Sequence, residues 1–330
     1  MKTITRILLL PGGLVLGLGL FSTANAAVSA NGLVGYYDFD GNGNDTAQAL
    51  GGNATANNGV LTNNAASGDV GTLESSFDAT TKAFGSGSLS VTNGDYLTLN
   101  YPAELQFGTG SFTFAYWMRI PDPISSDPTI IGNKNWSSSG GNLGFVQAIS
   151  GDDVKSNVAD TVGRKDTGLV DLDQASASQG PANTPADGWV FLALVVDRDA
   201  NLLSNYVADT WVSATTGDWN SGVTGADFGE DSSNPSTVDI SGVGSFDTNG
   251  LAGYAVNIGQ DGDGGDYNQL TANIDDLSVW NRALSREELW EMYYNGRQEN
   301  SLSGIVVPEP SSVVILFSLS GLCLFRRRRS

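Results

Sequence analysis

Aspartate and asparagine are the residues of this chain best suited to chemistry, and they are dense in the stretch DFDGNGND. It places Asp38, Asp40, Asn42 and Asp45 within eight residues. Carboxylate and amide oxygens on flexible loops are the ligands that Ca²⁺ prefers. Counted from Asp38, the stretch begins like an EF-hand loop, but Ala49 stands where the bidentate glutamate belongs. The stretch therefore predicts an oxygen-rich loop that is not an EF-hand.

Histidine and cysteine, two residue types that act in many enzyme mechanisms, are absent and nearly absent from the chain. The chain has no histidine, and its one cysteine, Cys323, lies in an apolar run near the C-terminus. This excludes Ser-His-Asp and Cys-His catalysis, histidine-bound zinc and a disulfide framework within the chain. The net charge of −20 repels nucleic acid, so no nucleic-acid partner is expected.

Both ends of the chain have the composition of export signals, and the first is predicted to be a signal peptide. Residues 1–26 combine two cations, Lys2 and Arg6, with an apolar stretch and the sequence Ala24-Asn25-Ala26. Small residues at the first and third of these last positions fit signal peptidase. We therefore expect signal peptidase to cleave after Ala26.

The other end, residues 308–330, begins with Pro308-Glu309-Pro310 and finishes with a cluster of four arginines before the last serine. The cluster comprises Arg326, Arg327, Arg328 and Arg329. Between triplet and cluster lie about 13 largely apolar residues, fewer than the roughly 20 that a membrane-spanning helix needs. The arginines stay in the cytoplasm under the positive-inside rule. We therefore expect a short transmembrane helix that anchors the chain transiently in the inner membrane, with the domain outside.

The triplet, the short apolar run and the terminal arginines together resemble the PEP-CTERM sorting signal of Gram-negative bacteria. The resemblance implies that an exosortase processes the tail during export. It also implies a destination at the cell surface or in the extracellular matrix.

The chain between the two ends has the pattern of an all-β protein. Short apolar runs alternate with Gly, Asn, Asp and Ser, and in FTFAYWMRI (112–120) the apolar side chains alternate with a period of two. This pattern is typical of an antiparallel sandwich or barrel. Strands are predicted at 33–39, 96–100, 112–120, 143–149, 189–197, 254–259 and 273–280.

One helix is predicted, in SREELWEMYYNG (285–296). Ser285 and Glu288 have the spacing of a capping box, and Gly296 suits a left-handed stop. Residues 297–307 lack periodicity and are predicted to be a linker, which leaves 27–296 as one domain.

Five segments in order are similar to LamG-like, concanavalin A-like lectin/glucanase domains, over roughly residues 31–296. They are LVGYYDFDGNGNDTA, FTFAYWMRI, GNKNWSSSGGNLGF, WVFLALVVDRDANL and NIDDLSVWNRALSREELWEMYYNG. The resemblance implies a two-sheet antiparallel jelly-roll sandwich, whose rim loops often bind glycans or proteins and frequently hold calcium. Tyr206-Val207-Ala208-Asp209-Thr210 departs from the family's Tyr-Val-Asp-Gly hairpin, so we expect a longer or distorted turn there.

The resemblance also suggests a rim calcium site, with Asp40, Asp45, Asn53 and Asp275 as its ligands. Because neighbouring strand residues face opposite ways, only one of Asp275 and Asp276 should reach a given site. The alternative is that these carboxylates form turns and solvated charge, for which Asp and Asn are common.

The candidate ligand-binding residues are Asn133, Lys134 and Trp136, in a polar, glycine-flanked loop. An indole in such a loop can stack on a sugar ring, and the two neighbours offer hydrogen-bond donors. The alternative is that Trp136 packs into the rim of the sandwich. Three tryptophans in predicted strands are expected in the core: Trp117, Trp189 and Trp280.

Three functions follow from these observations, and binding is the leading one. Glucanases of this fold carry Glu-x-Asp-x-x-Glu on one strand, and the chain lacks this spacing. We therefore expect a non-catalytic exported module that binds polysaccharide or a surface protein. A matrix protein cross-bridged by calcium is the second possibility, and a glycoside hydrolase is the third.

Overall fold

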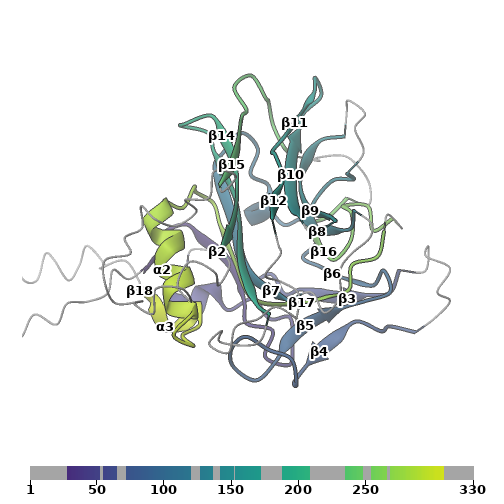
Figure 1. The fold of residues 1–330 in the computed structure, drawn as a ribbon, viewed down its shortest axis with the longest axis vertical. Helices are drawn as coiled ribbons and strands as arrows, with labels where there is room; N and C mark the ends of the chain where they lie inside the picture. The colour runs from purple at the N-terminus through teal and green to yellow at the C-terminus, as the bar shows by residue number, and fades with distance from the viewer. Residues whose placement is uncertain are drawn as a thin grey trace, which may run out of the picture.

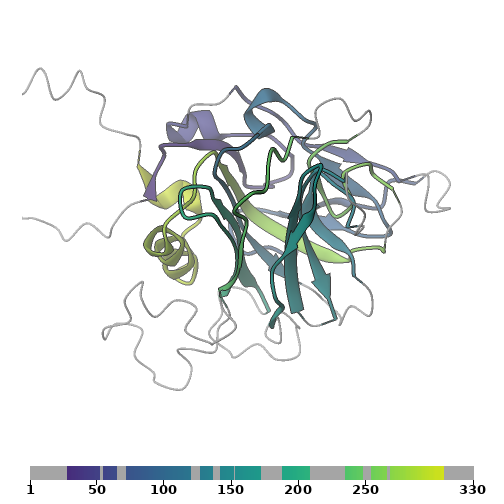
Figure 2. The same ribbon diagram turned by 90° about the horizontal axis from the view of Figure 1, so that it is seen from above.

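The computed structural model describes residues 28–52, 55–64, 72–119, 127–136, 142–151, 153–171, 188–208, 235–247, 254–265 and 268–307. These residues form two antiparallel sheets that pack face to face (Figure 1). Helices α2 (Arg286–Gly296) and α3 (Leu302–Ile305) lie against the outer side of one sheet, as the view from above also shows (Figure 2).

The front sheet, as we name it, has eight described strands. In spatial order they are β11 (Arg164–Asp166), β10 (Asp153–Ala159), β9 (Gly144–Ser150), β8 (Thr129–Gly132), β16 (Asn257–Ile258), β6 (Tyr96–Thr98) and β3 (Val60–Thr62), with β12 (Val170–Asp171) also pairing with β10.

The back sheet also has eight described strands. In spatial order they are β15 (Ser236–Asp239), β14 (Leu202–Ala208), β13 (Val190–Asp197), β7 (Phe112–Arg119), β17 (Ala272–Trp280), β5 (Ser88–Val91) and β4 (Ser76–Asp78), with β2 (Leu33–Tyr37) also pairing with β17.

Successive strands cross between the sheets. The chain passes from β6 in the front sheet to β7 in the back sheet and returns to β8, and it crosses again from β16 to β17. The predicted fold, an all-β two-sheet antiparallel jelly-roll sandwich, is confirmed. Two short 3₁₀ helices, η1 (Ala47–Leu50) and η3 (Ala103–Leu105), lie in the connections.

The main hydrophobic core lies between the sheets. In β7 the side chains of Phe112, Phe114, Tyr116 and Met118 point into it, as the period-two pattern predicts. Phe112 and Phe114 pack against Phe145 from β9, with ring centroids 4.8 and 5.1 Å apart. These contacts join the two sheets across the core.

A second hydrophobic cluster fills the outer side of the back sheet, beneath α2 and α3. It holds Leu289 and Met292 of α2 against the sheet, and the three tryptophans predicted to be in the core all belong to it. They are at most 2% exposed: Trp117, Trp189 and Trp280.

Helix α2 begins as predicted but ends differently. The Ser285 hydroxyl accepts a hydrogen bond from Glu288 N, and the Glu288 carboxylate accepts one from Ser285 N, which completes the capping box. Gly296 is still helical and is not a left-handed stop. A Cβ atom at Gly296 would lie 2.3 Å from Cζ2 of Trp117, so close packing is the reason for this glycine.

Residues 297–307 differ from the predicted linker. They contain α3 and the two-residue strand β18 (Val306–Val307), which pairs in parallel with β1 (Val28–Ser29). Leu302 is 1% exposed and belongs to the second hydrophobic cluster. The packed domain therefore runs through Val307.

Candidate ligand-binding site

The outer face of the front sheet is defined by the alternation of side chains in β10. Val154 and Val158 belong to the core between the sheets. Lys155 and Asn157, at the alternate positions, therefore face the other way. The β8–β9 connection and the β16–β17 connection bring further polar residues to this outer face.

Trp136, which follows β8, is held there by two cations. Lys155 Nζ of β10 lies 4.5 Å from the centroid of the indole, and the guanidinium carbon of Arg164 of β11 lies 5.7 Å from it. Arg164 also donates to the carbonyl of Trp136 over 3.1 Å. The side chain is partly exposed. Two strands thus fix the position of an aromatic ring that solvent still reaches.

Lys134 lies beneath this arrangement and is fully buried. Its Nζ donates to the carbonyl of Asn135 over 2.6 Å and to Oδ1 of Asn157 over 2.9 Å. Burial, together with the nearby charge of Arg164, lowers the pKa of Lys134 to about 7. Asn157 Nδ2 is buried and has no hydrogen-bond partner in the described part of the chain. A buried donor without a partner is rare, because its desolvation is then uncompensated.

Asp261 completes the cluster from the β16–β17 connection. Its carboxylate accepts hydrogen bonds from the Thr129 hydroxyl and, over 3.4 Å, from the backbone N–H of Trp136. Burial raises the pKa of Asp261 to about 6. Two buried titratable groups with perturbed pKa values, Lys134 and Asp261, therefore bond to the backbone of Asn135 and Trp136, and such groups occur often at functional sites.

The third predicted residue, Asn133, has a structural role. Its Oδ1 accepts the backbone N–H of Phe145 over 2.8 Å, and its Nδ2 donates to the carbonyl of Phe246 over 3.5 Å. The structure thus brings Lys134 and Trp136 together with Lys155, Arg164 and Asp261. Spacing in the sequence does not predict these last three, because residues of other strands and connections have no fixed spacing from the loop that they contact.

The three described candidates for calcium ligands each bind backbone amides. Asp45 accepts hydrogen bonds from the backbone N–H groups of Tyr36, Ala47 and Asn57. Asp40 accepts from two backbone N–H groups of the 85–87 turn. No group of three or more acidic or cysteine side chains in the described residues could hold a metal ion. The fourth candidate, Asn53, lies outside the described residues.

Asp275 and Asp276 do not alternate across the sheet as predicted. Strand β17 has a bulge here, and Asp276 has a φ of +53°. Because the bulge inserts an extra residue, both carboxylates lie on the side of the back sheet that α2 and α3 cover. Asp275 Oδ2 accepts the backbone N–H groups of Ala83 and Phe84. Asp276 accepts the Tyr36 hydroxyl and, over 2.8 Å, the backbone N–H of Leu302.

Comparison with protein families finds a match at the C-terminal end of the chain. Residues 306–329 match the PEP-CTERM protein-sorting motif. The chain carries a PEP-CTERM sorting motif. The match includes both the triplet and the arginine cluster on which the predicted resemblance depends.

The residues predicted to direct export and sorting lie outside the described part of the chain. They are Ala24 and Ala26 at the signal cleavage, Pro308, Glu309 and Pro310 in the triplet, and Arg326, Arg327, Arg328 and Arg329 in the terminal cluster. The short transmembrane helix expected between triplet and arginines lies outside it too. Among the described residues, no helix is long and apolar enough to cross a membrane.

Several solved structures are similar to the domain, at low identity. The binding domain of Paraclostridial Mosquitocidal Protein 1 is 14% identical over 72% of this chain and 48% of its own, with a TM-score of 0.46. The receptor binding domain of botulinum neurotoxin D is 12% identical over 81% and 53%, with a TM-score of 0.49. The chain thus spans about half the length of these domains. No curated protein matches it.

Proposed function

We propose that this protein is an exported, non-catalytic binding module that recognises polysaccharide through Trp136 at the cell surface or in the extracellular matrix. The observation that carries the proposal is the partly exposed indole, fixed on the outer face of the front sheet by Lys155 and Arg164. An indole face stacks on the C–H face of a sugar ring, and the flanking cations offer donors to its hydroxyl or carboxylate oxygens.

The sorting motif supports the destination. We propose that signal peptidase removes residues 1–26, that the tail holds the chain briefly in the inner membrane of a Gram-negative bacterium, and that an exosortase processes it. The net charge of −20 suits a soluble module outside the cell.

The experiment compares wild type with Trp136→Ala in binding to purified matrix polysaccharide of the producing organism, by titration calorimetry. We expect the variant to bind at least tenfold more weakly, which corresponds to about 1.4 kcal/mol. Trp290→Ala is the matched control, because Trp290 is also partly buried but lies on α2.

Three results would count against this function. Equal binding by wild type and Trp136→Ala would exclude the site. A glycan array and a matrix pull-down that both stay empty would exclude recognition of polysaccharide. Binding that survives enzymatic removal of polysaccharide from the matrix would identify a protein partner instead.

Calcium binding is a separate proposal, because the described carboxylates do not gather into a site. A calcium site would combine fewer than three of the described carboxylates with amide or backbone carbonyl oxygens, Asn53 among them. Titration calorimetry with Ca²⁺ and thermal unfolding with and without chelator test it. The absence of both heat and a change in melting temperature would exclude calcium as a structural ion.

A further inference from the structure

The segment that joins the domain to the sorting motif is folded onto the domain. We call residues 301–307 the strap: they comprise the N-cap Ser301, helix α3 and strand β18. The side chain of Leu302 anchors the strap, because it is 1% exposed within the hydrophobic cluster under α2. Val307, at the other end, is 46% exposed.

A hydrogen bond to a buried carboxylate holds the beginning of the strap. Asp276 Oδ2 accepts the backbone N–H of Leu302 over 2.8 Å, at a position where the short helix α3 offers an unpaired donor. The other oxygen of the same carboxylate accepts the Tyr36 hydroxyl. The bulge in β17 aims Asp276 at the strap, so the back sheet itself supplies the acceptor.

The end of the strap pairs with the beginning of the mature chain. Val306 and Val307 face Val28 and Ser29 in a parallel pair, and Ala30 N donates to the Val307 carbonyl over 3.0 Å. Because signal cleavage is expected after Ala26, β1 lies almost at the mature N-terminus. The strap thus joins the two ends of the domain.

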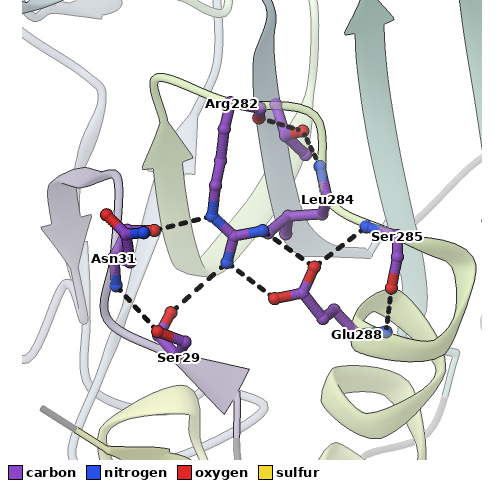
Figure 3. A network of polar contacts seen from close by, with 7 residues as sticks. Ser29, Asn31, Arg282, Leu284, Ser285 and Glu288 are labelled. Carbon is purple, nitrogen blue, oxygen red and sulfur yellow. Dashed lines mark hydrogen bonds and ion pairs between the residues drawn. The ribbon is translucent and has the colours of Figure 1, made fainter. Parts of the chain in front are cut away.

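Strand β1 is in turn fixed to helix α2 by Arg282 (Figure 3). Arg282 donates to the carbonyls of Ser29 and Asn31, over 3.4 and 2.6 Å, and forms a two-pronged ion pair with Glu288 at 2.6 and 2.8 Å. Glu288 also belongs to the capping box of α2. The partner strand of β18 is therefore part of a rigid network.

The sorting motif begins inside this structure. It covers residues 306–329, so its first two residues are strand β18. Only residues 308–312 separate the strap from the apolar run that starts at Val313. Fully extended, the chain from Val307 to Val313 reaches about 20 Å, whereas a free linker from Arg297 would reach about 55 Å.

We propose that the strap stays closed while the tail is in the membrane, so that the end of the domain carrying β1, β18 and α3 faces the lipid surface within about 20 Å. The partner of this end is the membrane that holds the tail. The inference depends on the sorting motif and not on ligand binding at Trp136, so either can fail without the other.

Hydrogen exchange on the full chain in vesicles of phosphatidylethanolamine and phosphatidylglycerol tests closure. The amides of Ala30 and Leu302 are bonded to Val307 and Asp276 only when the strap is closed. We expect both to exchange at least about 100-fold more slowly than unstructured peptide, and Leu302→Ser to abolish the protection. Val307→Ser is the matched control, because it changes an exposed residue of the same strap. Exchange at unstructured rates in wild type would overturn the proposal, even if Leu302→Ser fails to fold.

Energy transfer to dye-labelled lipid in the same vesicles tests the orientation. Single cysteines in a Cys323→Ser chain place the donor dye on the strap, at Ser303, or in the β10–β11 turn, at Val162, which is 86% exposed. We expect several-fold greater transfer from position 303 than from 162. Ten Gly-Ser residues inserted after Val307 should reduce transfer from 303. Equal transfer from the two positions, or no effect of the insertion, would overturn the proposed orientation.

Discussion

Asp275 and Asp276 are adjacent buried carboxylates, 1% and 6% exposed, and their pKa values follow from that environment. Burial raises the pKa of Asp275 well above its usual range, and the charge of Asp276 adds to the effect. Burial raises the pKa of Asp276 to about 6, although hydrogen bonds from Tyr36 and Leu302 act in the opposite direction. The folded protein therefore binds protons at Asp276 more tightly than the unfolded chain does.

This difference in proton binding predicts how the effect of Asp276→Asn on the free energy of unfolding changes with pH. A raised pKa in the folded state gives stability that is complete below about pH 4 and is lost as pH rises through about 6. Asp276→Asn removes the ionisation, and an asparagine can still accept from Leu302 N while donating to the Tyr36 oxygen. We therefore expect the variant to gain up to about 3 kcal/mol relative to wild type between about pH 4 and pH 8. Urea unfolding at both pH values measures this, and a pH-independent difference would contradict it.

Gly296 gives a second residue-scale prediction, in which two effects have opposite signs. Helix propensity alone makes Gly→Ala favourable by about 1 kcal/mol. The new Cβ would lie 2.3 Å from a buried Trp117 atom, and overpacking costs about 1–3 kcal/mol. We expect Gly296→Ala to lower the free energy of unfolding by up to about 2 kcal/mol, measured by urea denaturation. Gly304→Ala is the control, because no atom lies within 4 Å of its Cβ position. Stabilisation by Gly296→Ala would show that the helix moves away at little cost.

At the scale of elements, single aspartates tie loops to the strands. Asp95, in the β5–β6 turn, accepts the backbone N–H groups of Asn64, Glu74 and Ser75, which flank β3 and β4. Asp45 makes three such bonds in the β2–β3 connection. These contacts give an acidic chain a structural use for its carboxylates, since each one satisfies several loop donors.

Asp95→Asn tests this use of carboxylates. An amide has one acceptor oxygen in place of two, so some of the three loop N–H groups lose their partner in a buried place. We expect a loss of about 1–3 kcal/mol in the free energy of unfolding. Asp199→Asn, at an exposed hairpin position, should change it by less than about 0.5 kcal/mol. Equal effects of the two substitutions would mean that the Asp95 bonds add no net stability.

The elements that could be predicted from the sequence are those whose structure depends on the spacing of residues within the element itself. Strand β7 and the capping box of α2 depend on local spacing, and both were found. Strand β10 was missed, because the inward position between Val154 and Val158 holds the polar Ser156, which interrupts the apolar alternation and is buried in the fold. Trp136 and Lys134 were predicted from their loop. Arg164 and Asp261 join them only through tertiary pairing, which sequence spacing does not encode.

At the scale of the whole molecule, the extent of the domain decides how it is joined to its export signals. A boundary at Gly296 follows from helix periodicity, whereas packing places it after Val307. The difference matters because β18 is the only strand that pairs with β1 among the described residues. Without the strap, the mature N-terminus would lose its partner as well.

Truncation measures what the strap contributes. Without the strap, the hydrophobic cluster that Leu302 fills is exposed and Asp276 loses a hydrogen-bond donor, and removing one buried leucine side chain from a core typically costs about 2–5 kcal/mol. We therefore expect the free energy of unfolding of a chain of residues 27–296 to be about 2–4 kcal/mol lower than that of a chain of residues 27–307. Urea denaturation at neutral pH measures this difference. A chain of 27–307 carrying Leu302→Ser should fall near the shorter one, because the anchor is lost although the length is kept. Equal stability of all three would mean that the strap rests on the domain without stabilising it, and that the boundary at Gly296 was the correct one.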